Sequence, residues 1–416
     1  MNEETRAFIR EHREDDIRVL ALQGRHPVGV DMPWALEQIA GWQTAQQKLP
    51  TWSRNSEIVY PPHIGMEQCS SEMTARYKAD VALRWLRRDC TNRNNEGEKL
   101  LLADMTGGFG VDFAFMAEAI QKQKDLYTDK CSMLFMEKQQ HLCMIAKHNF
   151  DALGLKNINV ENGDSTTMIG NIDNVCIIFA DPARRDSNGG RTYAISDCTP
   201  DISALQDTLL EKADTVMIKL SPMLDISKVE DELKCVREIH VVGTNGECKE
   251  LLVVMSRHDT DTHMQLFCFD DGETVSFWKD DLALSVSIAD TLKEGMVLAE
   301  PSSCMMKTGA YGYMCKWLNA KAIAPNSHLF VGNTNCKLSR MFRSFTIKKI
   351  TTMNKRELQQ SLQGITHANI SVRNFPLSAP ELRKRLKLKD GGETYIFGTT
   401  DSRNQHLLLI CEKIKS

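Results

Sequence analysis

The segment from Asp104 to Asp112 has the composition of a ligand-binding turn. It reads Asp-Met-Thr-Gly-Gly-Phe-Gly-Val-Asp, follows an apolar run at 99–105, and precedes a helical stretch at 112–119. Glycine lets a ligand approach the backbone closely, and a helix N-terminus offers N–H groups without intrahelical partners. The dinucleotide fingerprint G-x-G-x-x-G fails because its third glycine position, counted from Gly108, is Phe113. The segment also lacks a P-loop pattern, so we expect a cofactor turn of another type.

Two further carboxylates follow the next apolar runs along the chain. Glu137 comes directly after Met133–Met136, and Asp164 follows a run at 158–160. Because open α/β sheets bind ligands at the carboxyl ends of their strands, we expect both acids to lie near the glycine-rich turn. A carboxylate can accept hydrogen bonds from two hydroxyl groups. Each acid taken alone is more often a surface or capping residue, but their shared position favours a binding role.

A fourth apolar run, at 175–180, leads into Asp181-Pro182-Ala183-Arg184. A carboxylate at the end of a strand can accept hydrogen bonds from a ligand. An arginine can stack on a base or hold a phosphate. The alternative is an ordinary loop with a turn proline, which the nearby glycine-rich segment disfavours.

The apolar runs alternate with helical stretches between residues 99 and 255, which predicts an α/β fold with a parallel sheet and helices on both faces. The Asn245-Gly246 pair predicts a hairpin, so the last strand should run antiparallel. Residues 1–98 are predicted to be mostly helical, ending in a polar linker at 91–98. Beyond residue 280 the alternation ends, and small α+β domains are expected. The expected strands are 99–105, 131–136, 158–160, 175–180, 215–220, 238–242, 251–255, 329–332, 394–397 and 407–411, and the expected helices are 70–88, 112–119, 138–153, 200–212, 226–236, 355–363 and 379–386.

Composition narrows the class of protein. The chain has 416 residues, of which 42% are hydrophobic and 25% charged, so a largely disordered or collagen-like chain is excluded and two to four domains are expected. The 13 cysteines form no C-x-x-C pair, which argues against a zinc or cluster site and favours reduced thiols. No leader-like N-terminus and no apolar stretch of about 20 residues occur. We therefore expect a cytoplasmic protein without a metal.

The charges are distributed unevenly along the chain. Residues 301–416 hold 19 of the 51 lysines and arginines but 6 of the 55 aspartates and glutamates. A basic C-terminal region beside an acidic remainder favours nucleic acid as a partner of the basic part. A solvated basic surface is the alternative.

The glycine-rich segment resembles motif I of class I S-adenosylmethionine-dependent methyltransferases. This resemblance implies that Glu137 binds the ribose and Asp164 the adenine of the cofactor. The loop at Asp181 resembles motif IV of methyltransferases that act on nucleic-acid bases, with Ala183 and Arg184 in place of a proline and an aromatic residue. The implied catalytic residues are Asp181, Pro182 and Arg184. The implied cofactor residues are Asp104, Thr106, Gly107, Gly108, Gly110, Asp112, Glu137, Lys138, Asp164 and Ser165.

From Lys48 onward, the chain resembles a bacterial family of THUMP-like methyltransferases, including its segments at 300–310 and 326–330. The resemblance implies a Rossmann-like methyltransferase sheet at 99–280 after the helical region at 1–98. It also implies a ferredoxin-like unit at 281–328 and a basic THUMP-like unit at 329–416 that binds RNA. The candidate RNA contacts are Tyr77, Lys78, Lys337, Arg340, Arg343, Arg383, Lys384 and Arg385.

The resemblance predicts methyl transfer to an exocyclic amine of a base in structured RNA, such as tRNA or rRNA, with S-adenosylmethionine as cofactor. One alternative is a C5-pyrimidine RNA methyltransferase. That chemistry needs a cysteine just beyond the fifth strand, where this chain has Ser221, while Cys198 precedes that strand. A second alternative is a non-catalytic RNA-binding protein built on a methyltransferase-like scaffold. A methyltransferase for small molecules or proteins is a third, although it gives the basic C-terminal region no use.

Overall fold

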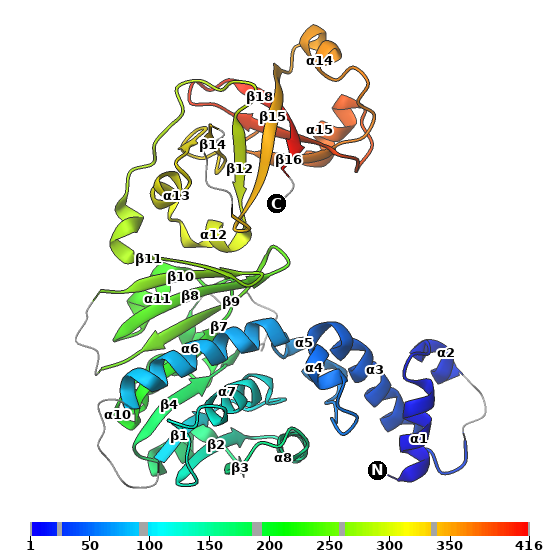
Figure 1. Cartoon of the computed structure of the whole chain (residues 1–416), viewed down its shortest axis with the longest axis vertical. Coiled ribbons are helices and arrows are strands. Elements are labelled where there is room, and N and C mark those ends of the chain that lie inside the picture. The colour runs from blue at the N-terminus through cyan, green and yellow to red at the C-terminus, as the bar shows by residue number, and fades with distance from the viewer. Residues whose placement is uncertain are drawn as a thin grey trace. The chain divides into compact units, whose positions relative to one another are not determined.

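The chain divides into two compact units, called unit 1 and unit 2. Unit 1 comprises Met1–Arg237 and Leu251–Thr262, and unit 2 comprises Glu238–Glu250 and His263–Ser416. Figure 1 shows the elements of both in a computed structural model. It describes residues 2–22, 27–90, 99–184, 194–257, 263–333 and 339–414. The linker predicted at 91–98 lies outside them. No helix among these residues is long and apolar enough to cross a membrane.

The part of the sheet that lies in unit 1 has the strand order β3-β2-β1-β4-β7, followed by residues 251–255 of β9. Its first five strands are parallel, and β9 runs antiparallel to β7. The parallel part therefore has the order of a Rossmann-like sheet, and the predicted antiparallel strand is confirmed. Strand β4 is buried along its whole length, as a continuous apolar strand should be. The bounds are β1 (Lys99–Asp104), β2 (Cys131–Glu137), β3 (Ile158–Asn162), β4 (Val175–Ala180), β7 (Ala213–Leu220) and β9 (Glu247–Met255).

The helices that precede and follow these strands begin and end at recognisable signals. The hydroxyl of Ser71 accepts a hydrogen bond from the Thr74 N–H at 3.3 Å and so caps α6. Helix α8 ends before Gly154, whose φ of 72° is the left-handed conformation expected after a helix C-terminus. Figure 1 shows α6 alongside α7, which it contacts. The bounds are α6 (Glu72–Cys90), α7 (Val111–Gln121), α8 (Gln140–Ala152), α9 (Ser165–Met168), α10 (Ile202–Lys212) and α11 (Ile226–Glu232).

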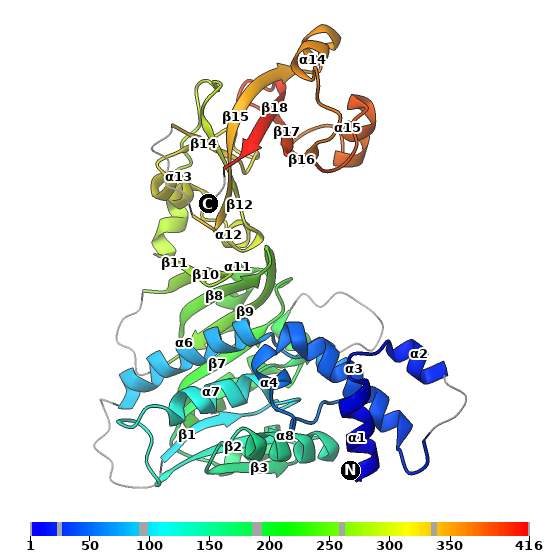
Figure 2. The ribbon, with the colours of Figure 1, turned by 45° about the vertical axis from the view of Figure 1, so that its right-hand side comes forward.

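The N-terminal region is helical, as predicted. Asp31 caps α3 by accepting a hydrogen bond from the Trp34 N–H. Phe8, Leu20 and Ile39 belong to a small hydrophobic core that joins the first three helices, and Figure 2 shows α1 against α3. The bounds are α1 (Glu3–His12), α2 (Ile17–Leu22), α3 (Met32–Lys48), α4 (Pro50–Ser53) and α5 (His63–Gln68).

Unit 2 contains several strands that the sequence analysis does not predict. The first two are β10 (Gln265–Asp270), which lies parallel to β8 (Val236–Thr244), and β11 (Glu273–Trp278), which pairs antiparallel with β10. Strands β12, β13, β15 and β16, whose bounds follow, were not predicted either. A second sheet follows, with the order β13-β14-β12-β15-β18-β17-β16, and the small α+β arrangement expected beyond residue 280 is confirmed. Its bounds are β12 (Val297–Pro301), β13 (Lys321–Ala322), β14 (Phe330–Gly332), β15 (Phe342–Thr352), β16 (Asn369–Arg373), β17 (Thr394–Thr400) and β18 (His406–Lys413), with helices α12 (Ser303–Thr308), α13 (Tyr311–Leu318), α14 (Lys355–Ser361) and α15 (Ala379–Leu386).

Candidate active site

The glycine-rich turn joins β1 to α7 and packs tightly against β2. The Gly107 N–H donates to the Met136 carbonyl at 3.0 Å, and a Cβ at position 107 would lie 2.5 Å from Cζ of Phe135. Gly110 directly precedes α7 with φ 80°, a left-handed conformation that favours glycine. Gly108 also has a positive φ, yet a Cβ there would approach only the Thr106 carbonyl within 4 Å. The turn is therefore held on its β2 side and has room around Gly108.

Asp104 ends β1 as a buried carboxyl beneath the turn. It accepts a hydrogen bond from the Thr106 N–H at 2.8 Å. Burial raises the pKa of Asp104 to about 8, and the nearby carboxylates of Asp112 and Asp181 push it in the same direction. Asp104 therefore holds a proton at neutral pH.

Glu137 connects the end of β2 to the turn. One of its oxygens accepts the Gly108 N–H at 2.8 Å, and the other accepts the Gln139 N–H at 2.7 Å. The side chain is mostly buried, with 8% of the residue exposed. Glu137 thus orders the glycine-rich turn through its carboxylate.

Asp164 follows β3 and caps the short helix α9, which begins at the buried Ser165. Its carboxylate accepts hydrogen bonds from the Thr166 N–H at 3.0 Å and the Thr166 hydroxyl at 2.6 Å. Lys138 lies 3.4 Å away. These hydrogen bonds from Thr166 lower the pKa of Asp164, and Lys138 adds to the effect. The side chain remains 46% exposed, so a ligand can reach it.

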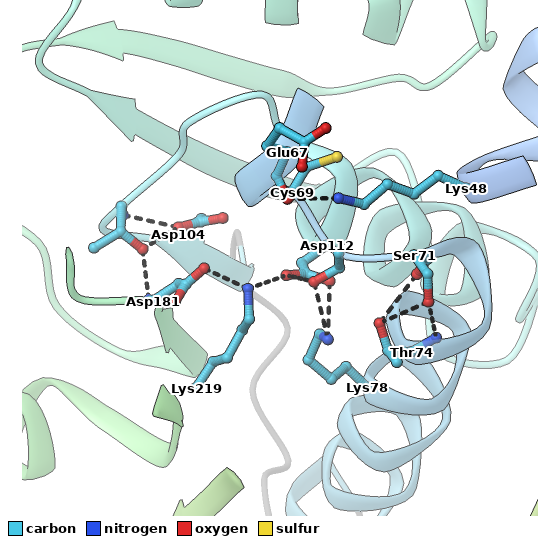
Figure 3. Close-up of polar contacts among 12 residues, drawn as sticks. Lys48, Glu67, Cys69, Ser71, Thr74, Lys78, Asp104, Asp112, Asp181 and Lys219 are labelled. Atoms are coloured by element: carbon cyan, nitrogen blue, oxygen red, sulfur yellow. Dashed lines mark hydrogen bonds and ion pairs between the residues drawn. The ribbon is translucent and has the colours of Figure 1, made fainter. Parts of the chain in front are cut away.

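Asp181 is anchored to the glycine-rich turn and to β7. Its N–H donates to the Thr106 hydroxyl at 2.6 Å, and its carboxylate lies 2.6 Å from Nζ of Lys219. Figure 3 shows Lys219 between Asp181 and Asp112, whose carboxylate is 3.8 Å from the same nitrogen. The sequence analysis missed Lys219 as a site residue, although a lysine within the apolar run 216–220 was a usable signal.

Asp112 and Lys78 form a buried ion pair between α7 and α6. Lys78 Nζ lies 3.2 Å from Asp112, and the Ser70 hydroxyl donates to the same carboxylate at 2.8 Å. Burial alone would raise the pKa of Asp112, but Lys78 and Lys219 outweigh it and hold the pKa below its usual value. The sequence analysis treats Tyr77 and Lys78 as RNA contacts. Both are instead buried in this structure. Lys78 is buried completely because it is the cation that pairs with the buried Asp112.

The rest of the Asp181 loop continues into a small two-stranded ladder. Pro182 is buried, and β5 (Ala183–Arg184) pairs with β6 (Cys198–Thr199), which sets Cys198 opposite Arg184. Burial raises the pKa of Cys69, a further cysteine close to Asp112, to about 11. The Cys69 thiol is therefore protonated at neutral pH and is a weak nucleophile.

The basic candidates in unit 2 differ in what they contact. Arg343 pairs with the buried Glu300, and Arg383 pairs with Asp390. These two guanidinium groups are already engaged in ion pairs. Three other candidates, Arg340, Lys384 and Arg385, are exposed, while Lys337 lies outside the described residues.

Comparison with known proteins identifies the C-terminal domains. Residues 298–337 match the model of a ferredoxin-like domain, and residues 342–413 match the model of a THUMP-like domain. The two occur in the predicted order, while the boundaries expected at 281–328 and 329–416 stay predictions. No curated protein matches the chain.

A solved structure matches the whole chain. It is a protein from Porphyromonas gingivalis W83 described as a “putative methyltransferase”, 28% identical, with 100% of each chain covered and a TM-score of 0.80. An rRNA methylase from Streptococcus thermophilus is also similar, at 12% identity and a TM-score of 0.29, over 43% of this chain and 94% of its own. The first of these shares its fold with this chain from end to end.

Proposed function

We infer that this chain, which has a methyltransferase fold followed by ferredoxin-like and THUMP-like domains, is an S-adenosylmethionine-dependent methyltransferase that acts on RNA. One observation carries the proposal. The carboxyl ends of β1, β2 and β4 are connected at the glycine-rich turn, because Glu137 binds the Gly108 N–H and Asp181 binds Thr106. Ligand sites of open α/β sheets lie at this edge. The proposal follows from this cluster of acids and glycines rather than from any single residue.

The residues at this edge fit the cofactor. The space around Gly108 lets a ligand approach the backbone. The Glu137 oxygens each accept one N–H, and a carboxylate has further lone pairs for two ribose hydroxyls. The exposed part of the Asp164 carboxylate can accept a hydrogen bond from the adenine amine. When bound, S-adenosylmethionine supplies a methyl group on a sulfonium that is a good leaving group.

Asp181 is the residue that we assign to the substrate. Its backbone is fixed by Thr106 and its carboxylate by Lys219, so its orientation is set before a base arrives. We propose that the carboxylate accepts an N–H of the base amine and points the nitrogen lone pair at the methyl group. Positioning of this kind can supply most of the rate enhancement. Pro182 and Arg184 complete the loop, and Arg184 is proposed to contact the base or its phosphate.

The RNA part of the proposal rests on unit 2. Its THUMP-like domain at 342–413 carries most of the basic residues of the C-terminal region. Exposed lysines and arginines such as Lys384 and Arg385 bind phosphates and orient an RNA without reading its sequence. We propose structured RNA, tRNA or rRNA, as the substrate, and an exocyclic amine as the methylated group.

The decisive experiment is a calorimetric titration of S-adenosylhomocysteine into the wild-type chain and the Asp164→Ala variant. We expect saturable binding by the wild type and weaker binding by the variant. Asp181→Ala should bind the product as the wild type does, yet lose methyl transfer to RNA. An absence of binding by the wild type would refute the proposal that the chain is an enzyme and favour a non-catalytic RNA-binding protein. Turnover by Asp181→Ala would refute the role of Asp181 alone.

A further inference from the structure

Unit 1 contains a cavity in its N-terminal helical region, apart from the candidate active site. It has a volume of about 360 Å³ and is lined by α1, α3, the segment 53–60 and the C-terminal half of α8. This size falls within the range of small-molecule sites. None of the residues assigned above to the cofactor or to the base lines it. Its function is therefore a separate question from the proposed methyl transfer.

The walls of the cavity carry an excess of positive charge. Four of the lining residues are arginines, Arg6, Arg10, Arg13 and Arg54, and the one acidic lining residue is Glu57, 3.9 Å from Arg6. Guanidinium groups bind phosphate oxygens with two parallel hydrogen bonds. The cavity therefore suits an anionic ligand with a phosphate.

Aromatic side chains form another part of the wall. Trp34, Trp42 and Tyr60 line the cavity, and the Arg13 guanidinium lies 4.7 Å from the Trp42 ring centroid. Aromatic rings next to arginines are the combination by which proteins bind unpaired bases with their phosphates. A phosphate alone would make no use of the rings.

Two of these aromatic residues have buried hydrogen-bond donors without partners. Neither the Trp34 indole N–H nor the Tyr60 hydroxyl has a hydrogen-bond partner among the described residues, whereas the Trp42 indole donates to the Ser53 carbonyl at 3.0 Å. Tyr60 is only 4% exposed. An unpartnered buried donor costs free energy, so such groups call for an explanation. Both residues line the cavity, so we take a ligand with acceptor atoms as the explanation for these two donors.

We propose that this cavity binds a nucleoside 5′-monophosphate group, either as a free nucleotide or as the 5′-terminal nucleotide of an RNA. The arginines bind the phosphate, the aromatic rings contact the base, and the Trp34 and Tyr60 donors bind acceptors on the base or sugar. This inference goes beyond the proposed function and does not rest on it. Binding of S-adenosylhomocysteine would be unaffected if the inference failed.

The test is calorimetry on the full chain with four kinds of probe. These are the four nucleoside 5′-monophosphates, a short oligoribonucleotide with and without a 5′-phosphate, inorganic phosphate, and an oligoglutamate peptide. We expect at least one monophosphate, or the 5′-phosphorylated oligonucleotide, to bind at least tenfold more tightly than inorganic phosphate. Tighter binding of the monophosphate would assign the cavity to a free nucleotide, and tighter binding of the oligonucleotide to an RNA end. Equal binding of inorganic phosphate or oligoglutamate would overturn the proposal, as would no binding at all.

Variants then locate the binding in this cavity. The double change Arg13→Glu and Arg54→Glu should weaken nucleotide binding at least tenfold, while Lys147→Glu should not. Lys147 is exposed on α8 beside His148 but does not line the cavity. Equal effects of both changes would show that the nucleotide binds elsewhere.

Tyr60→Phe separates a ligand contact from a structural role. It removes only the unpartnered hydroxyl, so the protein should be as stable as the wild type or more stable. Nucleotide affinity should nevertheless fall about fivefold, as expected for the loss of one hydrogen bond. Unchanged affinity would show that the hydroxyl does not bind the ligand, against the proposal.

Discussion

Asp104 and Asp112 lie eight positions apart, and both are buried, yet their surroundings shift their pKa values in opposite directions. Burial raises the pKa of Asp104 to about 8, because its main partner is the neutral Thr106 N–H. Asp112 is equally buried, but the charges of Lys78 and Lys219 hold its pKa low. Neighbouring cations, rather than burial, therefore decide which carboxylate is ionised at neutral pH.

The raised pKa of Asp104 predicts a pH dependence of stability. Folded Asp104 keeps its proton up to about pH 8, whereas the unfolded chain releases it near the ordinary aspartate pKa of 3.8. Folding therefore takes up a proton between these values, and this contribution to stability falls as pH rises. Relative to Asp104→Asn, the wild type should lose about 1.4 kcal/mol of unfolding free energy per pH unit in that window. Urea unfolding of both proteins at pH 5, 6.5 and 8 measures the difference.

Asp164→Asn is the control, because the contribution of Asp164 to stability changes with pH in the opposite direction. Hydrogen bonds lower the pKa of Asp164, so its contribution is present above the unfolded pKa and is lost on acidification. The wild type should therefore lose stability relative to this variant only as the pH falls below about 4. A wild-type to Asp104→Asn difference that stays constant from pH 5 to 8 would show that Asp104 is ionised in the folded protein.

Lys219 shows that residue types alone do not predict which side chains form ion pairs across neighbouring strands. Its ion pair with Asp181 joins positions 38 residues apart and depends on β7 lying next to β4, where Ala180 is opposite Ile218. The strand pattern predicts both strands but not which strands are neighbours. The acids at the strand ends could be predicted from sequence, whereas their cationic partners required the three-dimensional fold.

At the scale of elements, the Lys78–Asp112 pair ties α6 to α7. Lys78→Met should destabilise the protein by about 3–5 kcal/mol, because it leaves a buried carboxylate with a weaker set of partners. The matched control is Lys122→Met, which removes an exposed lysine paired with Glu118 on α7. That change should cost about 0.5 kcal/mol or less. Chemical unfolding of both variants is the measurement, and equal costs would contradict a structural role of the buried pair.

The β1–α7 turn makes a separate prediction. A Cβ added to Gly107 would lie 2.5 Å from Phe135 Cζ and 2.9 Å from the Met136 carbonyl. Gly107→Ala should therefore shift the turn, lower stability by about 1–3 kcal/mol and weaken S-adenosylhomocysteine binding. Gly170→Ala is the control, because a Cβ there meets nothing within 4 Å. Calorimetry and chemical unfolding of both variants distinguish a steric clash at position 107 from the effect of replacing any glycine by alanine.

The sequence predicts the strands of unit 1 better than those of unit 2. Periodicity and the Asn245-Gly246 turn predict the sheet of unit 1, including its antiparallel strand. Strands β10 and β11 were missed, even though Asp271-Gly272 between them is an equally strong hairpin signal. Strand β10 shows no alternation because residues 266–269 are all apolar. Strand β11 does alternate, with Val275 and Phe277 buried between exposed neighbours, so its period was a usable signal that the sequence analysis overlooked.

At the scale of the whole molecule, charge is segregated along the chain. The basic C-terminal region contains exposed cations together with arginines already bound to Glu300 or Asp390. An arginine that is paired with a carboxylate must break that ion pair before it can contact a phosphate. An unpaired cation can contact a phosphate directly and release the counterions of the RNA. The number of basic residues in the sequence therefore overestimates the number of RNA contacts that the proposed function allows.

Lys384 and Arg385 on α15 are exposed, and they test the RNA role of unit 2. Their double reversal to glutamate should weaken binding to a tRNA pool at least tenfold. The slope of log affinity against log salt should fall by about two, because each contact contributes roughly one. Binding of S-adenosylhomocysteine should not change.

The control, Lys122→Glu with Lys124→Glu, makes the same change in charge within unit 1 and should leave the slope as it is. Filter binding at several salt concentrations measures both slopes. Equal slopes for both double variants would mean that RNA does not bind through this face of the THUMP-like domain, whereas wild-type binding without salt dependence would mean that phosphate contacts contribute little.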